Sequence, residues 1–318
     1  MINKIKFVYI LNIVTLTSCI FVLFLNSTFS ESIDSQSKKT AQRKIIEKID
    51  KDPTKKSNKA EKYFSKGNDY FKKKDYAQAI IYYQKALRID SNNTEAYNNL
   101  GVVHGESKNH QKEIGYYQKA IQIDPTYFYS YYNLGCVYLE LGNYQQAITN
   151  LEKAIQINPD YVEAHNNLAI THGKLGNHQK EIAYLEKAIQ INPDFAETYN
   201  NLGITYGEIG NYQQAVIYFK KAIDIIPRYE TYIHLAVDYT KLDNYQEALI
   251  YAKKALQINP NHASVNLALG GIYGGLKDYA NSKKYYQKAK ELCTQQGNSE
   301  CIAATNKMLI MIDNMVEE

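Results

Sequence analysis

The hydrophobic pattern of the chain is a pair of short helices that recurs along most of its length. In one stretch Tyr199, Leu202 and Tyr206 fall at helical intervals, and a second apolar run with the same spacing follows between residues 215 and 222. Gly210 interrupts the pattern between the two runs, and Pro227 ends the second one. This stretch therefore predicts two antiparallel helices of about 14 residues each.

The same pair is repeated at a nearly constant interval. Five of the six prolines are separated by 34, 34, 34 and 33 residues; they are Pro125, Pro159, Pro193, Pro227 and Pro260. A small residue keeps the same step at Gly67, Gly101, Gly135, Ala169, Gly203, Ala236 and Gly270. One pair cannot bury both of its faces, so a period of this size predicts a stack of pairs instead of one compact catalytic domain.

These positions resemble the tetratricopeptide repeat family. The unit that shows it best carries Tyr199, Leu202, Gly203, Tyr206, Ala215, Phe219, Ala222 and Pro227. The resemblance implies an all-α, right-handed superhelical solenoid of about seven helix-turn-helix repeats, whose concave groove binds a protein or peptide. The first and last units depart from the pattern, as the ends of an array do: Lys66 and Ser91 in the first, and Asn266, Ser282 and Thr294 in the last.

The repeat gives the domain boundaries. Residues 60–296 divide into seven units, and an amphipathic helix within residues 297–318 is expected to cap the last of them; the units are 60–93, 94–127, 128–161, 162–195, 196–228, 229–262 and 263–296. Residues 31–59 are polar and basic and form a linker, and residues 1–30 stand apart as a signal peptide or membrane anchor.

The first 30 residues predict export. Residues 7–25 are uncharged and apolar, Lys4 and Lys6 precede them, and Glu31 and Asp34 follow. A helix of this length would just cross a bilayer with the start of the chain in the cytoplasm. Three fates remain open: cleavage after Ser30, retention as an anchor, or lipidation at Cys19. We therefore expect a periplasmic, secreted or membrane-anchored protein, which contacts the membrane only through this segment.

Charge and motifs exclude several function classes. The chain is formally +4, but the excess lies near the N-terminus, and residues 60–318 carry 26 basic and 28 acidic residues. No basic face for nucleic acid is expected from this balance. The repeats contain no glycine-rich phosphate loop, nucleophile elbow or zinc signature, so we expect no enzyme and no cofactor.

An asparagine column is the strongest candidate for a binding site. Asn99, Asn133, Asn167 and Asn201 recur in the first helices of units two to five, and by helical phase they are expected to face the groove and solvent. An amide offers a donor and an acceptor, so such a ladder can hold an extended peptide backbone, as it does in some members of the family. The alternative is that Asn-Asn-Leu-Gly is simply a common sequence for this helix.

Two repeats share a second polar feature. His104, His110 and Glu113 in unit two recur 68 residues later as His172, His178 and Glu181. Two histidines and a glutamate suit a metal ion. The preferred interpretation is polar packing, in which a neighbouring hydrogen-bond donor compensates for a glutamate placed in an alanine column. We therefore predict no metal site.

Cys293 and Cys301 flank the junction with the capping helix. In an oxidising compartment they would close a small loop worth roughly 2.5 kcal/mol, and two free buried thiols are the alternative. Cys136 stands alone.

We expect a non-catalytic scaffold that binds a protein or peptide. The alternatives are an envelope assembly factor, of the kind that supports pili or secretins, and the accessory subunit of a separately encoded enzyme. The sequence predicts neither the identity of the partner nor the oligomeric state.

Overall fold

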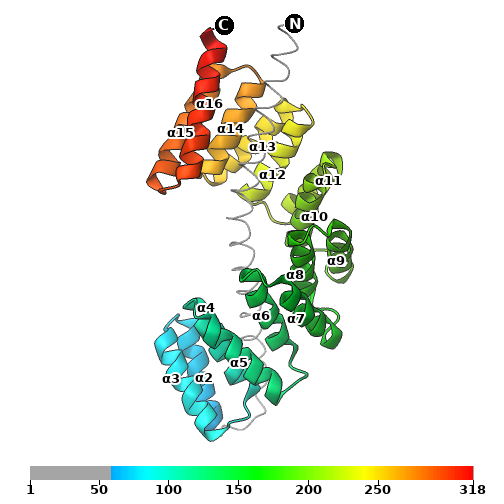
Figure 1. Cartoon of the computed structure of the whole chain (residues 1–318), viewed down its shortest axis with the longest axis vertical. Helices are drawn as coiled ribbons and strands as arrows, with labels where there is room; N and C mark the ends of the chain where they lie inside the picture. The colour runs from blue at the N-terminus through cyan, green and yellow to red at the C-terminus, as the bar shows by residue number, and fades with distance from the viewer. Residues whose placement is uncertain (1–58, 318) are drawn as a thin grey trace. The chain divides into compact units, whose positions relative to one another are not determined.

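The described part of the computed structural model, residues 59–317, is entirely helical (Figure 1). The predicted class, an all-α repeat solenoid with a C-terminal helix, is confirmed. The helices are α2 (Lys59–Lys72), α3 (Tyr76–Ile89), α4 (Thr94–Glu106), α5 (His110–Ile123), α6 (Phe128–Glu140), α7 (Tyr144–Ile157), α8 (Val162–Lys174), α9 (His178–Ile191), α10 (Ala196–Glu208), α11 (Tyr212–Ile225), α12 (Tyr229–Lys241), α13 (Tyr245–Ile258), α14 (Ala263–Gly275), α15 (Tyr279–Gln295) and α16 (Ser299–Glu317).

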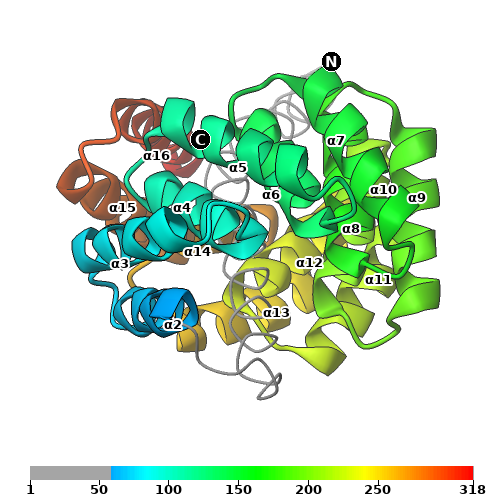
Figure 2. The same cartoon turned by 90° about the horizontal axis from the view of Figure 1, so that it is seen from below.

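The described helices group into two compact units, residues 59–191 and residues 192–317. In the first, α2 to α9 form four antiparallel pairs, and each pair packs on the next. In the second, α10 to α15 form three pairs, and α16 packs on α15. The pairs follow one another in chain order within each unit (Figure 1 and Figure 2). In every pair the even-numbered helix comes first, and we call it the first helix.

The turn inside each pair has a fixed conformation. Gly142, Gly176 and Gly210 have φ between 73° and 80°, in the left-handed region. The equivalent position in the other four repeats is also left-handed, with φ between 54° and 62°, although its residues are Lys74, Lys108, Asp243 and Lys277. The next residue is always Asn or Asp, and in five repeats its side chain caps the second helix. Asn211, for example, accepts from the backbone N–H of Gln214 at 3.2 Å. The helix break that the sequence indicates at Gly210 is thus built into every repeat.

The column of small residues exists because a side chain of the second helix lies directly on it. A Cβ added at Gly203 would lie 2.5 Å from Phe219, and one at Gly101 would lie 2.5 Å from Tyr117. Ala236 is tolerated in the same column because the second helix of its repeat carries Ala252 where Phe219 stands in the preceding one. In this pair the smaller residue of the second helix therefore makes room for the larger residue of the first.

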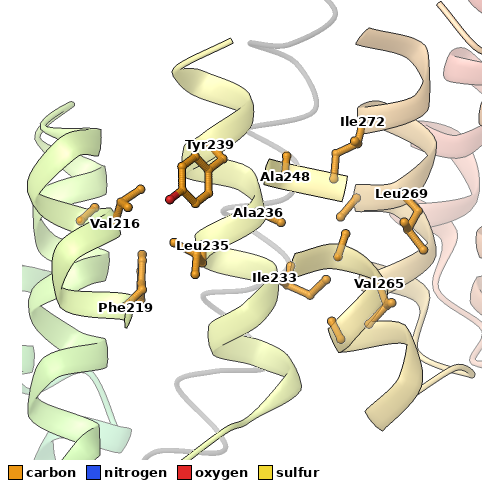
Figure 3. Packing of buried hydrophobic residues seen from close by; sticks show 14 residues of the cluster. Val216, Phe219, Ile233, Leu235, Ala236, Tyr239, Ala248, Val265, Leu269 and Ile272 are labelled. Atoms are coloured by element: carbon orange, nitrogen blue, oxygen red, sulfur yellow. The ribbon is translucent and has the colours of Figure 1, made fainter. Parts of the chain in front are cut away.

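The core of the second unit shows how consecutive pairs join. Val216 and Phe219 of α11, Leu235 of α12 and Leu269 of α14 belong to one buried cluster, and Figure 3 shows α12 between α11 on one side and α14 on the other. The last second helix, α15, has 17 residues where the others have 14. Thr294 replaces the proline found here in repeats two to six, which permits the helix to continue. Repeat one also lacks this proline, at Ser91, yet α3 ends at Ile89, so the replacement permits the extension without requiring it.

Candidate binding face on the first helices

The asparagine column lies on α4, α6, α8 and α10, but the expectation that it faces solvent is wrong. Asn99, Asn133, Asn167 and Asn201 are only 2–6% exposed. Helical phase describes a residue's position on its own helix and does not show what packs against that side. It did not show that this side of a first helix packs against the first helix of the preceding repeat.

Three of the four amides are hydrogen-bonded to that preceding helix. Asn99 Nδ2 donates to Asn68 Oδ1 at 3.1 Å, and Asn133 Nδ2 donates to Asn98 Oδ1 at 3.1 Å. Asn167 Nδ2 lies 3.2 Å from Tyr132 Oη and 3.1 Å from Cys136 Sγ. The column therefore couples consecutive first helices. Whether it also binds a peptide stays a prediction.

A second amide column escaped the sequence analysis. Ser130 Oγ donates to Asn98 Oδ1 at 3.0 Å, and in the other unit Thr231 Oγ1 donates to Asn200 Oδ1 at 3.0 Å. The Nδ2 groups of Asn98 and Asn200 are buried and find no acceptor among the described residues, and the same is true of Asn68. The Asn-Asn pairs in the sequence could have revealed this second column. Two neighbouring asparagines on one helix occupy different positions of the repeat, so one column accounts for only one of them.

The paired histidines and glutamates form short contacts but not the expected trio. His110 Nδ1 lies 3.0 Å from Glu113 Oε2, and His178 Nδ1 lies 2.9 Å from Glu181 Oε2. His104 and His172 instead stack on tyrosines of the second helix, with ring centroids 5.3 and 5.6 Å apart. In neither hairpin do all three side chains offer ligand atoms within 4.8 Å of one another.

The structure joins Cys293 and Cys301 in a disulfide, with their Cα atoms 5.8 Å apart. Both cysteines are buried, and Leu292 and Ala263 lie in the same cluster. The bond links α15 to the start of α16. Cys136 is buried on α6 beside Asn167, outside this disulfide.

One buried carboxyl group was not anticipated. Asp238 of α12 is 6% exposed, and its Oδ2 has no hydrogen-bond partner among the described residues. Burial raises the pKa of Asp238 to about 8, against a smaller opposing effect of Lys241. One turn earlier, burial lowers the pKa of His234 to about 4. The repeat pattern did not indicate a buried carboxyl group at position 238, because repeat one places the exposed Asp69 there and the remaining repeats place Val, Ile or Thr.

The expected export segment, Cys19 and the linker lie outside the described residues. Within residues 59–317, no helix combines the length and the apolar character needed to cross a bilayer.

The fold and its repeated small and aromatic positions define a helical repeat protein that binds other proteins. The chain belongs to the tetratricopeptide repeat family: models described as "TPR repeat" and "Tetratricopeptide repeat" match residues 67–107, 94–127, 116–149, 136–176, 162–195, 196–229, 229–262 and 263–296. Repeats of this family form protein-interaction scaffolds and are typically non-catalytic.

Several solved structures share this fold. A tetratricopeptide repeat protein from Parabacteroides merdae is 20% identical with a TM-score of 0.62, covering 77% of this chain and 98% of that one. PilW, whose structure is described as that of a type IV pilus biogenesis factor, is 23% identical with a TM-score of 0.61, covering 67% of this chain and 99% of that one. MamA is 33% identical over 50% of this chain and 93% of its own, with a TM-score of 0.46. None of the curated proteins compared with the chain is significantly similar to it.

Proposed function

We propose that the protein is a non-catalytic scaffold that holds an extended peptide on the face formed by its first helices, through the amide columns. In each unit the site consists of the asparagines of that unit; they are Asn68, Asn98, Asn99, Asn133 and Asn167 in residues 59–191, and Asn200 and Asn201 in residues 192–317.

The observation that carries this proposal is the hydrogen-bonding capacity left over after the helices have packed. The side-chain oxygens of Asn99, Asn133 and Asn167 accept no hydrogen bond from the described residues and are not fully buried. The Nδ2 groups of Asn68 and Asn98 lack an acceptor. A peptide backbone offers the complementary donors and acceptors at every residue.

The spacing of the columns also suits an extended chain. Packed helices lie about 8–10 Å apart, and an extended peptide advances about 3.3 Å per residue. One amide per repeat would therefore meet the backbone at about every third residue. Contacts of this kind are made to the main chain, so they hold many sequences and leave selectivity to other groups on the face.

The test compares two sets of amide substitutions. Asn99→Ala, Asn133→Ala, Asn167→Ala and Asn201→Ala together remove the first column. The control set lies on second helices: Gln146→Ala, Asn150→Ala, Gln156→Ala and Gln190→Ala. The partner is recovered by crosslinking to the wild-type protein, and its affinity for each variant is then measured well below the melting temperature of that variant.

We expect the column variant to bind about thirtyfold to about twenty-thousandfold more weakly, because each of the four amides contributes about 0.5–1.5 kcal/mol. It should also melt at a lower temperature, since the same amides couple the first helices. Unchanged affinity, or an equal loss in the control set, would place the binding surface elsewhere.

A further inference from the structure

Charged side chains are distributed unequally between the two layers of helices in repeats two to four. The first helix of repeat one, α2, is instead basic, with four lysines against two acidic residues. The first helices of repeats two to four carry four acidic residues, Glu95, Glu106, Glu140 and Glu163, against the single Lys174. The second helices of the same repeats carry five lysines against four glutamates. In residues 192–317, α10 and α12 carry three glutamates against Lys241, while the buried Asp238 keeps its proton at neutral pH. The near-neutral total of the repeats therefore conceals an acidic first-helix face in repeats two to four.

Two of these carboxylates lie on either side of a tyrosine. Glu95, Tyr129 and Glu163 hold the same position in three successive first helices. The pKa of Tyr129 is raised, first by burial and then by the negative charges of Glu163 and Glu95. Both carboxylates therefore act on the same hydroxyl group, and the potential around the Tyr129 ring is negative.

Tyr129 belongs to a cluster of aromatic rings at the beginning of α6 and α8. Its ring centroid lies 4.0 Å from that of Phe128 and 5.8 Å from that of Tyr161. The Tyr161 ring makes edge-to-face contacts with two other rings. Its centroid lies 4.8 Å from that of Tyr132 and 5.0 Å from that of Phe128, with interplanar angles of 85° and 65°. Ring faces attract cations, and more strongly where water is excluded. Aromatic rings flanked by two carboxylates form a site suited to a lysine ammonium or an arginine guanidinium.

A second observation on α4 is a buried side-chain amide that lacks a hydrogen-bond acceptor. Asn98 follows Glu95 by one turn on α4, and its side chain is fully buried. Its oxygen accepts from Ser130 and Asn133, while its Nδ2 has no acceptor among the described residues. A buried donor without a partner costs about 1–3 kcal/mol, and the carbonyl oxygen of a peptide would relieve this cost. A cationic side chain and a backbone carbonyl occur together in a basic peptide.

We propose that the partner held by the first-helix face of repeats two to four, formed by α4, α6 and α8, is an extended segment of another protein rich in lysine and arginine. One cationic side chain lies against the Tyr129 ring between Glu95 and Glu163. The inference rests on the proposed peptide-binding function and adds the chemical class of the peptide. Within the face, the amide columns hold the backbone, and the carboxylates and rings select its charge.

The test uses the full chain in mild detergent and three fluorescent peptides of equal length. In the first peptide lysine alternates with serine, and the other two carry glutamine or glutamate in place of lysine. Binding is followed by fluorescence anisotropy at low and at high salt. We expect the lysine peptide to bind most tightly, the glutamate peptide most weakly, and added salt to weaken the lysine complex.

Substitutions then locate the cation. Glu95→Gln with Glu163→Gln should weaken the lysine peptide about tenfold, and Tyr129→Leu should weaken it about threefold. Glu95→Gln alone provides a milder variant, because Glu163 is only 2% exposed. The control is Glu152→Gln with Glu186→Gln, which removes two exposed carboxylates from the second helices and should leave the affinity unchanged. The melting temperature of each variant shows that it is folded.

Three results would overturn the proposal. If the glutamine peptide binds as tightly as the lysine peptide and the amide-column variant loses it, the protein binds peptides but does not select basic ones. If the control variant weakens binding as much as Glu95→Gln with Glu163→Gln, the effect is one of net charge and not of this face. If the lysine peptide binds only after the nine Lys and Arg residues of positions 31–59 are changed to glutamine, the occupant is the chain's own linker. Failure of the proposed function itself appears differently, as binding that the amide-column variant retains.

Discussion

At the scale of single residues, Asp238 is the group whose surroundings least suit its charge. It occupies a position that is Val103, Val137 or Ile272 in other repeats, all of them buried. A Cβ at Gly207 would lie 3.4 Å from Asp238 Oδ1, so the carboxyl lies against the preceding first helix. Burial in this apolar position disfavours the ionised form and keeps the proton on the folded protein.

This shift predicts a pH-dependent stability. The pKa of Asp238 is about 8 in the folded protein, against an ordinary aspartate value of 3.8, so between these values the folded state binds more protons than the unfolded state. Stability from this group therefore falls as pH rises through that window and is constant above it. Asp238→Asn should match the wild type at about pH 4 and gain a growing advantage up to about pH 8.

The measurement is urea unfolding of both proteins at several pH values. The opposing titration of His234 is common to both proteins and cancels in the difference. Asp224→Asn, at an exposed carboxylate of α11, is the control and should show no such trend. A constant difference between Asp238→Asn and the wild type would show that Asp238 is ionised in the folded protein.

The residue scale is also where the sequence was least informative. Periodicity identified Tyr199, Leu202 and Tyr206 as packing residues because they contact the helix that follows in the same repeat. It could not show that Asn99 and Asn133 are buried against the preceding repeat, since that depends on how one pair stacks on the next. Asp238 was unpredictable for the same reason, because its burial arises between repeats.

At the scale of helix pairs, a glycine and a glutamate have adapted to each other. Glu113 enters the alanine column of α5 and is 1% exposed. Gly105 of α4 makes room for it, because a Cβ there would collide with Glu113 Oε1. Gly173 and Glu181 show the same relation at 2.5 Å. The sequence revealed the duplicated glutamates and a donor beside each, but not the glycines that accommodate them.

Double substitution tests this pairing. Gly105→Ala should destabilise the wild type by about 1–3 kcal/mol through overpacking. In the Glu113→Ala background the same change should stabilise by up to about 1 kcal/mol, because alanine favours the helix. Gly115→Ala is the control, as nothing lies within 4 Å of its Cβ position. Additive effects of the two substitutions, measured by thermal unfolding, would mean that the side chains do not compete for space.

The disulfide joins α15 to α16, and its contribution to stability is measurable. Cys293 and Cys301 are eight residues apart, and closing a loop of this size stabilises by about 2.5 kcal/mol. Cys293→Ser with Cys301→Ser should lower stability by about that amount and increase hydrogen exchange at the start of α16. Alkylation of the wild-type protein without reduction should leave both cysteines unmodified. Full alkylation would show two free thiols, the alternative that the sequence left open.

At the scale of the whole molecule, the repeat made the fold predictable. Five prolines at a spacing of 34 or 33 residues, with matched columns of small and large residues, specify the same helix pair again and again. Nearest-neighbour stacking then leaves few alternatives for the architecture. The peptide and its charge were not predictable in this way, because the acidic face is divided among helices that are far apart in the sequence.

The whole molecule also has to reach the compartment in which it binds its partner, and the apolar residues 7–25 predict that it is exported. On this prediction the basic residues Lys4 and Lys6 would keep the start of the chain inside, and the acidic Glu31 and Asp34 would follow on the outer side. A reporter enzyme that works only outside the cytoplasm, fused after residue 60, should therefore be active. The control places Asp residues in the middle of the apolar run, where each charge opposes insertion by about 2.5–3.5 kcal/mol, and should abolish the signal. Activity of a cytoplasm-only reporter at the same position would contradict export.

Once export is established, the mass of the mature protein separates the three fates. Cleavage after Ser30 removes the apolar run and gives a protein that leaves the membrane with salt, whereas retention gives the full mass and requires detergent. Lipidation gives a chain beginning at Cys19 with added acyl mass, which Cys19→Ser would abolish. Each fate leaves the acidic face of the repeats on the outer side, so a basic partner would also have to be exported or to expose its segment there.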